Sequence, residues 1–422
     1  MHQTEDILFA VLLQLIVIVL AARGANRLAR RWGQPAAVGE IVVGLMLGPS
    51  LLGYALPDLS QFIFSPAATM PISVLSQLGL ILLMFQIGSD FKFSYLGNAR
   101  NRKTTIGIAL VSIAVPFALG LLIGALSSSI LAPSVDIITY SLFVGVAMAI
   151  TAVPILGRIL REFDLTRTEI GVIAISAAAI NDVIGWLMLA GITAYASARF
   201  SAEVSSLQIG GIVVLALALW FVGRPAVNWL LRQLPVADGR VSPNLMAVTL
   251  GVLFALAICT YLLGIFSIFG GFATGLLFHR HRGFVEAWRN QVGQFVLVFF
   301  LPVFFTYTGL RTNILGLVTL SDWSWCGIIC AAAILGKIVP VYFAARAGGF
   351  SRDDSATLGV LMNTRALMEL IVLNVGFDLG FIPQHVFTML VIMAVVTTMM
   401  SAPLLRVFLR RTGHVIPLQI EA

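Results

Sequence analysis

Residues 174–186 read Ala174-Ile175-Ser176-Ala177-Ala178-Ala179-Ile180-Asn181-Asp182-Val183-Ile184-Gly185-Trp186. The stretch lies inside a long apolar run between Arg167 and Arg199, so a helix through it would place Asp182 near the middle of a membrane. An aspartate at that depth costs about 2.5–3.5 kcal/mol on insertion scales, and such residues are usually functional. Small neighbours leave room beside it for another backbone or an ion. The alternative is a structural aspartate that is hydrogen-bonded inside a helix bundle.

The composition is that of a polytopic membrane protein. Of the 422 residues, 59% are hydrophobic and only 11% are charged. The net charge of +7 does not indicate a nucleic-acid partner, because the charges fall in short clusters between apolar runs. The three cysteines all lie in apolar runs, and no histidine accompanies Cys326 and Cys330, so we expect buried thiols and no cofactor. The acidic start of the chain does not resemble a cleavable signal peptide.

The apolar runs predict an all-α protein with about thirteen transmembrane helices. The expected spans are 7–22, 35–52, 71–88, 104–126, 137–160, 168–196, 207–230, 244–263, 265–280, 290–309, 323–345, 355–374 and 384–408.

The loop charges alternate with these spans. Most of the 26 lysines and arginines follow odd-numbered spans, and the opposite side keeps only Arg199 and Arg311. Since positive residues favour the cytoplasmic side, we expect the N-terminus outside and the C-terminus in the cytoplasm. We expect an integral protein of a bacterial inner membrane.

Five ionisable residues are predicted to lie inside spans. They are Glu40, Asp182, Lys337, Arg365 and Glu369. Buried groups of both signs indicate paired charges that line a cavity. For Glu40, which is near the cytoplasmic end of its helix, the alternative is a side chain that reaches back to the interface.

Two pairs of segments are similar in sequence. Residues 39–47 in the second span align with 270–278 in the ninth, and residues 84–90 in the third align with 305–311 in the tenth. The paired spans cross the membrane in opposite directions, so the repeats would be inverted, as in many secondary transporters. We therefore expect one membrane domain over residues 1–422, with repeats at roughly 1–196 and 244–410 and a linker helix at 207–230. No cytosolic regulatory domain is expected after it.

The fifth and twelfth spans, which are equivalent in this scheme, both contain interruptions. One is Thr151 to Pro154, where the proline would free backbone carbonyls near Thr151. The other is the polar run Asn363, Thr364 and Arg365. Non-helical backbone at membrane depth is tolerated where it lines a cavity, and its free carbonyls can receive ions. A simple proline kink is the alternative for the fifth span.

These groups suit the binding of a monovalent cation or a proton. The carboxylate of Asp182, the amide of Asn181 and the hydroxyl of Thr151 are oxygen-rich ligands, whereas the thiolates and clustered imidazoles that transition metals prefer are absent. Low-dielectric surroundings favour the neutral form of a carboxyl group, so it can hold either a proton or a cation. Competition for one site, combined with alternating access, is antiport. Lys337 would neutralise Asp182 when neither ligand is bound.

The chain resembles the monovalent cation:proton antiporter superfamily, in the branch of Kef-type potassium efflux systems and plant cation/proton exchangers. The stretches that carry the resemblance are 39–50, 151–160, 176–186, 302–305 with 309–314, and 361–365 with 369–374. The resemblance implies a homodimeric elevator-type transporter in which two broken helices, marked by Pro154 and Asn363, cross beside Asp182. It implies that Asp182 binds the ion, that Asn181 is its partner and that Thr151 faces the ion. Lys337 would contact the Asn-Asp pair, and Glu40, Arg365 and Glu369 would be supporting charges.

The expected function is secondary active exchange of K⁺ or Na⁺ for protons, serving pH homeostasis, with the lipid bilayer as the surrounding solvent. Two alternatives stay open: a proton-coupled transporter of an organic ion on the same fold, and a cation channel. An enzyme is not expected, because the five histidines lie near membrane edges or in the tails.

Overall fold

The computed structural model describes residues 2–90, 99–151, 153–166, 168–198, 202–237, 239–263 and 266–412. Within these ranges the chain folds into helices joined by turns and short irregular segments, with one isolated bridge between Ala237 and Arg240. The predicted all-α class is therefore confirmed.

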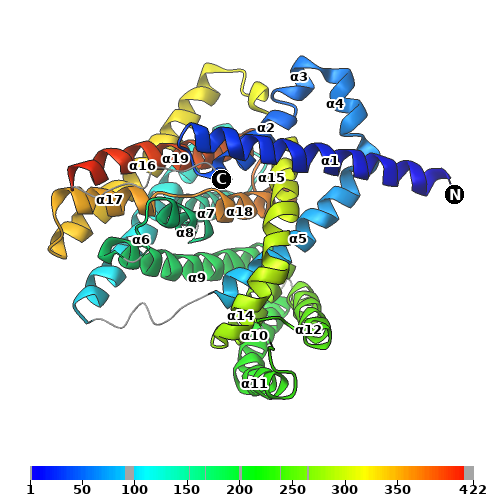
Figure 1. Cartoon of the computed structure of the whole chain (residues 1–422). Coiled ribbons are helices and arrows are strands. Elements are labelled where there is room, and N and C mark those ends of the chain that lie inside the picture. The colour runs from blue at the N-terminus through cyan, green and yellow to red at the C-terminus, as the bar shows by residue number, and fades with distance from the viewer. Residues whose placement is uncertain are drawn as a thin grey trace. The chain divides into compact units, whose positions relative to one another are not determined.

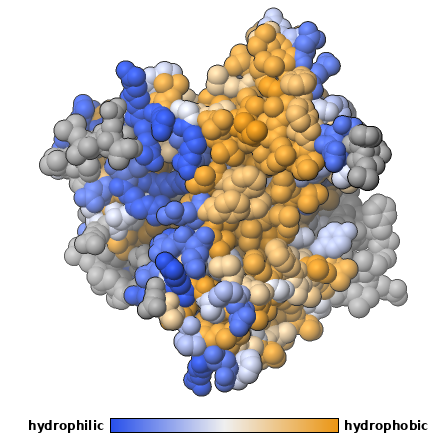
Figure 2. All heavy atoms as spheres, turned by 45° about the vertical axis from the view of Figure 1, so that its right-hand side comes forward, coloured by the Kyte–Doolittle hydropathy of each residue, from blue (hydrophilic) through white to orange (hydrophobic). Residues whose placement is uncertain are grey.

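Eleven helical stretches in the described ranges are long and apolar enough to cross a membrane. The two other predicted spans, 137–160 and 265–280, contain shorter apolar helices, Ile137–Ala149 and Ser267–Phe278. Figure 2 shows a face on which apolar side chains form a broad continuous area. Exposed Leu20, Phe221 and Leu262 are examples of such side chains, and so much exposed apolar surface requires lipid around it.

The chain divides into two compact units, each described by itself. The first comprises Met1–Val19, Phe64–Lys92 and Ala190–Tyr307. It holds the start of α1, the end of α9 (Glu169–Ala198) and most of α15, together with α5 and the helices from α10 to α14, most of which are labelled in Figure 1. The bounds are α1 (His2–Arg31), α5 (Thr69–Ser89), α10 (Ala202–Ala218), α11 (Arg224–Gln233), α12 (Pro243–Leu262), α13 (Ser267–Phe278), α14 (Arg282–Trp288) and α15 (Leu301–Leu310).

The second unit comprises Leu20–Ile63, Phe93–Leu189 and Thr308–Ala422. Its helices are α2 (Ala36–Leu47), α3 (Leu52–Ala55), α4 (Pro57–Ile63), α6 (Ala99–Leu131), α7 (Ile137–Ala149), α8 (Val153–Glu162), most of α9 (Glu169–Ala198), α16 (Leu320–Ala347), α17 (Arg352–Met362), α18 (Leu367–Asp378) and α19 (Gln384–Arg411). α6 packs on α7 and α16, α16 packs on α17 and α19, and α18 packs on α7. α17 and α18 are almost entirely buried, which sets them apart from the lipid-facing helices.

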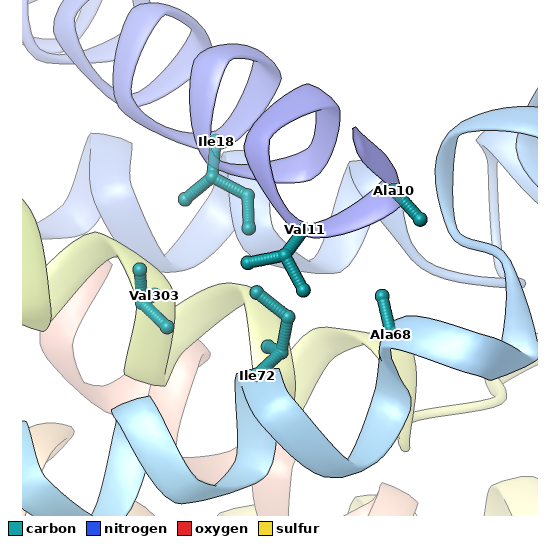
Figure 3. Packing of buried hydrophobic residues seen from close by; sticks show 6 residues of the cluster. All are labelled: Ala10, Val11, Ile18, Ala68, Ile72 and Val303. Carbon is teal, nitrogen blue, oxygen red and sulfur yellow. The ribbon is translucent and has the colours of Figure 1, made fainter. Parts of the chain in front are cut away.

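In the first unit, a small apolar cluster ties the first helix to its neighbours. Figure 3 shows Val11 and Ile18 of α1 facing Ile72 of α5 and Val303 of α15. The backbones of helices α5 and α13 pack closely, because glycines of the two helices face each other across their contact. A β-carbon at Gly275 would meet the carbonyl oxygen of Phe85.

We expect Gly275→Val to lower the thermal stability of the detergent-solubilised protein by several degrees, because the added carbons would meet the α5 backbone, which cannot rotate away. The matched control is Gly251→Val on α12, which is exposed and has open space at its β-carbon position. A melting curve for Gly275→Val that coincides with that of Gly251→Val would contradict this close packing.

A related glycine contact occurs in the second unit. A β-carbon at Gly309 would meet the carbonyl of Gly44 and lie 2.7 Å from the amide nitrogen of Leu45. In the first unit, a β-carbon at Gly88 would lie 3.2 Å from the Cα of Gly275. The sequence alignment of the two halves pairs Gly44 with Gly275 and Gly88 with Gly309. Equivalent positions therefore make equivalent close approaches.

Candidate functional site

The predicted span 137–160 is interrupted where its helix-breaking sequence lies. α7 ends at Ala149, Ile150 is extended with φ −69° and ψ 144°, and α8 begins at Val153. Pro154 is the second residue of α8, where proline is tolerated because the first N–H groups of a helix lack intrahelical acceptors. The side chain of Pro154 lies outside the described residues.

The predicted span 355–374 is also interrupted. α17 ends at Met362 and α18 begins at Leu367, so Asn363 and its neighbours form a non-helical connection. Ala366, the last residue of this connection, has φ 80° and ψ −99°. That conformation is strained for any residue except glycine and persists only where the surrounding structure holds it.

The two interruptions lie side by side. The Thr151 hydroxyl donates a hydrogen bond of 3.0 Å to the carbonyl oxygen of Met362, the last residue of α17. α7 packs against α18, and Figure 1 shows the labels of α7, α8 and α18 together in the same part of the second unit. One broken helix therefore satisfies a free carbonyl at the end of the other.

Asn181 of α9 fixes this arrangement through all of its side-chain hydrogen-bonding groups. Its Oδ1 accepts a bond of 3.1 Å from the backbone N–H of Thr151. Its Nδ2 donates to the hydroxyl of Ser112 at 3.1 Å and to the carbonyl of Ala149 at 3.3 Å. Asn181 thus holds the end of α7 and the residue after the break in one geometry.

Asp182, the next residue, is buried at 3% exposure, and neither carboxylate oxygen has a hydrogen bond of normal geometry to a described residue. The backbone N–H of Val153, at the start of α8, and the charge of Lys337 act electrostatically on the carboxyl group. The positive end of a helix stabilises an anion near it. Asp182 is therefore a buried carboxyl group on which the start of α8 and the charge of Lys337 both act.

Two buried cationic side chains occupy the other end of the first break. The ammonium of Lys337 donates to the carbonyl oxygen of Ala149, which also accepts from Asn181. Arg365 donates to the carbonyl of Ala147 at 3.2 Å and to that of Ala333 at 3.1 Å. Both cations offset the negative end of α7, where the carbonyls lack intrahelical donors.

The supporting carboxyl groups fall in two places. Glu369, in the first turn of α18, is fully buried, and the charges of Arg365 and Lys337 act on it. Glu40 is not part of this group: its Oε1 accepts a bond of 2.8 Å from Asn26, and the charges that act on it are those of Arg158 and Arg23.

Asn363 lies at the second break, where its Nδ2 is 3.8 Å from the sulfur of Met400 and its Oδ1 has no partner among the described residues. Of the side chains that build the site, sequence reasoning missed Ser112, because a single serine in an apolar span carries no signal of its own. No group of three or more His, Cys, Asp and Glu side chains in the described ranges is arranged to hold a metal ion.

Taken together, these residues form a small oxygen-lined site. The Asp182 carboxyl group lies beside two helix interruptions, makes no hydrogen bond of normal geometry to a described residue, and is acted on by the Val153 backbone and by the charge of Lys337. Carboxylate, hydroxyl and carbonyl oxygens are ligands for alkali cations, and a buried carboxylate is also a proton acceptor. The arrangement is chemically able to bind either.

Comparison with known proteins gives a family match over nearly the whole chain. The model of the family described as "Sodium/hydrogen exchanger, transmembrane" matches residues 15–411. The Na(+)/H(+) antiporter NhaS4 of Synechocystis is 38% identical over 405 residues, which are 94% of this chain and 96% of that protein. Cation/H(+) antiporter 17 of Arabidopsis thaliana is 34% identical over 95% of this chain, which spans only 48% of that longer protein.

A solved structure supports the fold independently. The sodium proton antiporter MjNhaP1 from Methanocaldococcus jannaschii superposes with a TM-score of 0.64, covering 94% of this chain and 96% of that one. The sequence identity is 16%, so this likeness concerns the arrangement of the helices.

Proposed function

Because the chain belongs to the sodium/hydrogen exchanger family of transmembrane proteins, we propose that it exchanges a monovalent cation, K⁺ or Na⁺, for protons across a membrane. The observation that carries the proposal is the Asp182 carboxyl group, which is buried beside two broken helices and makes no hydrogen bond of normal geometry to a described residue. Such a group is costly to bury and is retained in membrane interiors for the binding of ions or protons.

The cation and the proton compete for Asp182. A carboxylate can share its oxygens with a cation or hold a proton, but one bound ligand lowers the affinity for the other. Exchange follows when the loaded site faces the two sides of the membrane in turn. Alternating access of this kind needs no ligand other than the two that compete.

The neighbouring residues have distinct roles in this proposal. Asn181 positions the break and keeps Asp182 beside it through its bond to the N–H of Thr151. Thr151 faces the ion while its hydroxyl is held by Met362. Lys337 balances the charge of empty Asp182 and lies next to Asn181 through the shared carbonyl of Ala149.

We propose that the molecule is one membrane domain built from inverted repeats, roughly 1–196 and 244–410, linked by 207–230 and moving by an elevator mechanism as a homodimer. The glycine contacts support the repeats, since the approach of Gly88 to Gly275 has its counterpart in that of Gly309 to Gly44. The charge pattern supports a cytoplasmic C-terminus. We place the protein in a bacterial inner membrane, where such exchange contributes to pH homeostasis.

The deciding experiment measures proton movement in proteoliposomes with an internal pH-sensitive dye after addition of NaCl, KCl or an organic cation. An antiporter of metal cations gives proton flux that depends on Na⁺ or K⁺ and persists when the membrane potential is clamped at zero. A channel gives cation flux without coupled protons, and a transporter of organic ions responds to the organic cation alone. Either of these results would replace the proposed function.

We expect Lys337→Met to lower the melting temperature by several degrees, because it removes the cation that acts on the buried Asp182 and one of the two that act on the buried Glu369. The control is Lys103→Met, at an exposed position of α6, which should melt like the unchanged protein. Equal melting temperatures for the two variants would show that the Lys337 charge does not stabilise the site.

A further inference from the structure

Asp182 and Glu369 share a condition that sets them apart from the other carboxyl groups of the described residues. In each, both oxygens are buried and have no hydrogen bond of normal geometry to a described residue. Each is also associated with the start of the second half of a broken helix. Asp182 of α9 is acted on by the backbone N–H of Val153, the first residue of α8, and Glu369 lies in the first turn of α18. The proposed antiport uses Asp182 and leaves Glu369 without a role.

The groups around Glu369 do not hold it as a carboxylate. Arg365 donates hydrogen bonds from two of its nitrogens to the carbonyls of Ala147 and Ala333, and its Nε has no partner among the described residues. Lys337 donates to Ala149. A buried carboxylate needs donors to stay ionised, and without them the protonated form is favoured. Arg365, Lys337 and Cys330 are the charged or titratable groups that act on Glu369.

Lys337 connects the two carboxyl groups. Its charge acts on both. Its bond to the carbonyl of Ala149, which also accepts from Asn181, places it beside the residue that precedes Asp182. A cation that arrives at Asp182 repels the ammonium of Lys337. The ammonium then acts more on Glu369, where a positive charge favours the ionised carboxylate over the protonated carboxyl group.

We propose that Glu369 is a second proton-binding site, and that a cation at Asp182 expels the proton of Glu369 through Lys337, so that each cation is exchanged for two protons. This inference rests on the proposed antiport. In the proton-loaded form both carboxylates carry a proton, and Lys337 and Arg365 leave a net charge of +2. In the cation-loaded form both carboxyls are ionised, and the bound cation brings the net charge to +1. Exchange therefore moves one net charge in each cycle.

The experiment finds the pH difference at which net proton flux stops. The proteoliposomes have the same concentration of thiocyanate on both sides, and this permeant anion holds the membrane potential near zero. The concentration of Na⁺ or K⁺ differs tenfold between the two sides. A tenfold concentration ratio and about one pH unit are equal driving forces, so one-for-one exchange stops at about one unit and two-for-one exchange at about half a unit.

We expect net proton flux to stop at a pH difference of about half a unit in the unchanged protein and of about one unit in Glu369→Gln, since the amide carries no proton. The control is Glu162→Gln at the cytoplasmic end of α8, which should stop at about half a unit like the unchanged protein. If the amide variant carries no flux, Glu369→Asp takes its place, because it retains a carboxyl and should transport with the balance point of the unchanged protein.

Three results would overturn the second site: a balance at about one unit in the unchanged protein, the same balance point in Glu369→Gln as in the unchanged protein, or loss of transport in Glu369→Asp as well as in Glu369→Gln. None of these would refute antiport itself. The absence of any cation-dependent proton flux in the unchanged protein would refute the antiport and not the second site alone.

Discussion

Asp182→Asn is expected to abolish cation-driven proton movement in proteoliposomes while the protein still inserts and folds. The amide has the shape of a protonated carboxyl group, and the native oxygens make no hydrogen bond of normal geometry to a described residue that the change would break. It has neither the charge that attracts a cation nor the ability to take up a proton. The site would remain in a form that resembles the proton-loaded state.

The measurement is dye dequenching on addition of Na⁺ and of K⁺, normalised to the amount of reconstituted protein. Asp58→Asn is the matched control, because Asp58 is exposed on the short helix α4. Its exchange rate should equal that of the unchanged protein. If Asp182→Asn retained more than a small fraction of the rate, with the melting temperature preserved, Asp182 would not be the carrier site.

The sequence predicts the parts of the site that depend on local rules. The depth of Asp182 follows from the length of its apolar run, and the break near Thr151 follows from a proline that cannot donate a backbone hydrogen bond. The polar run that begins at Asn363 predicts the second interruption. The glycines that bring helices together are visible as well, because small residues allow close backbone approach in membranes.

The parts that the sequence does not predict depend on where individual backbone groups end up. Lys337 and Arg365 donate to carbonyls near the end of α7, and no side-chain pattern marks those carbonyls as acceptors. Ala366 is a strong helix former, yet it has a positive φ, because tertiary packing overrides its propensity. Depth in the membrane alone groups Glu40 with the other buried charges, whereas its hydrogen bond from Asn26 places it elsewhere.

The exchange rate is expected to be bell-shaped in pH, with an acidic limb that moves when the cation concentration changes. At low pH, protons occupy Asp182 and exclude the cation, while at high pH protons become scarce as co-substrate. Because cation and proton bind the same carboxylate, raising the cation concentration tenfold should shift the acidic limb to lower pH by up to about one unit. The apparent cation affinity should weaken in parallel as the pH falls.

A separate pH sensor would behave differently, and the turn after α13 offers candidates to compare. Burial lowers the pKa of His279 and of His281, where the nearby charge of Arg280 acts in the same direction. His281 also contacts the side-chain oxygen of Asn228 at 2.9 Å. A limb set by these histidines would stay at one pH at every cation concentration and would move in the double variant His279→Gln, His281→Gln.

The test therefore records dequenching across pH at several concentrations of Na⁺ and K⁺ in both the unchanged protein and the histidine double variant. Competition at Asp182 predicts the same concentration-dependent shift in both, because the histidines lie beyond the end of α13 and are not part of the site. An acidic limb that stays fixed while the cation concentration rises tenfold would exclude the shared site, even if Asp182 proved essential. Asp182 would then serve the cation alone, and the transported proton would have to bind elsewhere, with Glu369 as the first group to replace.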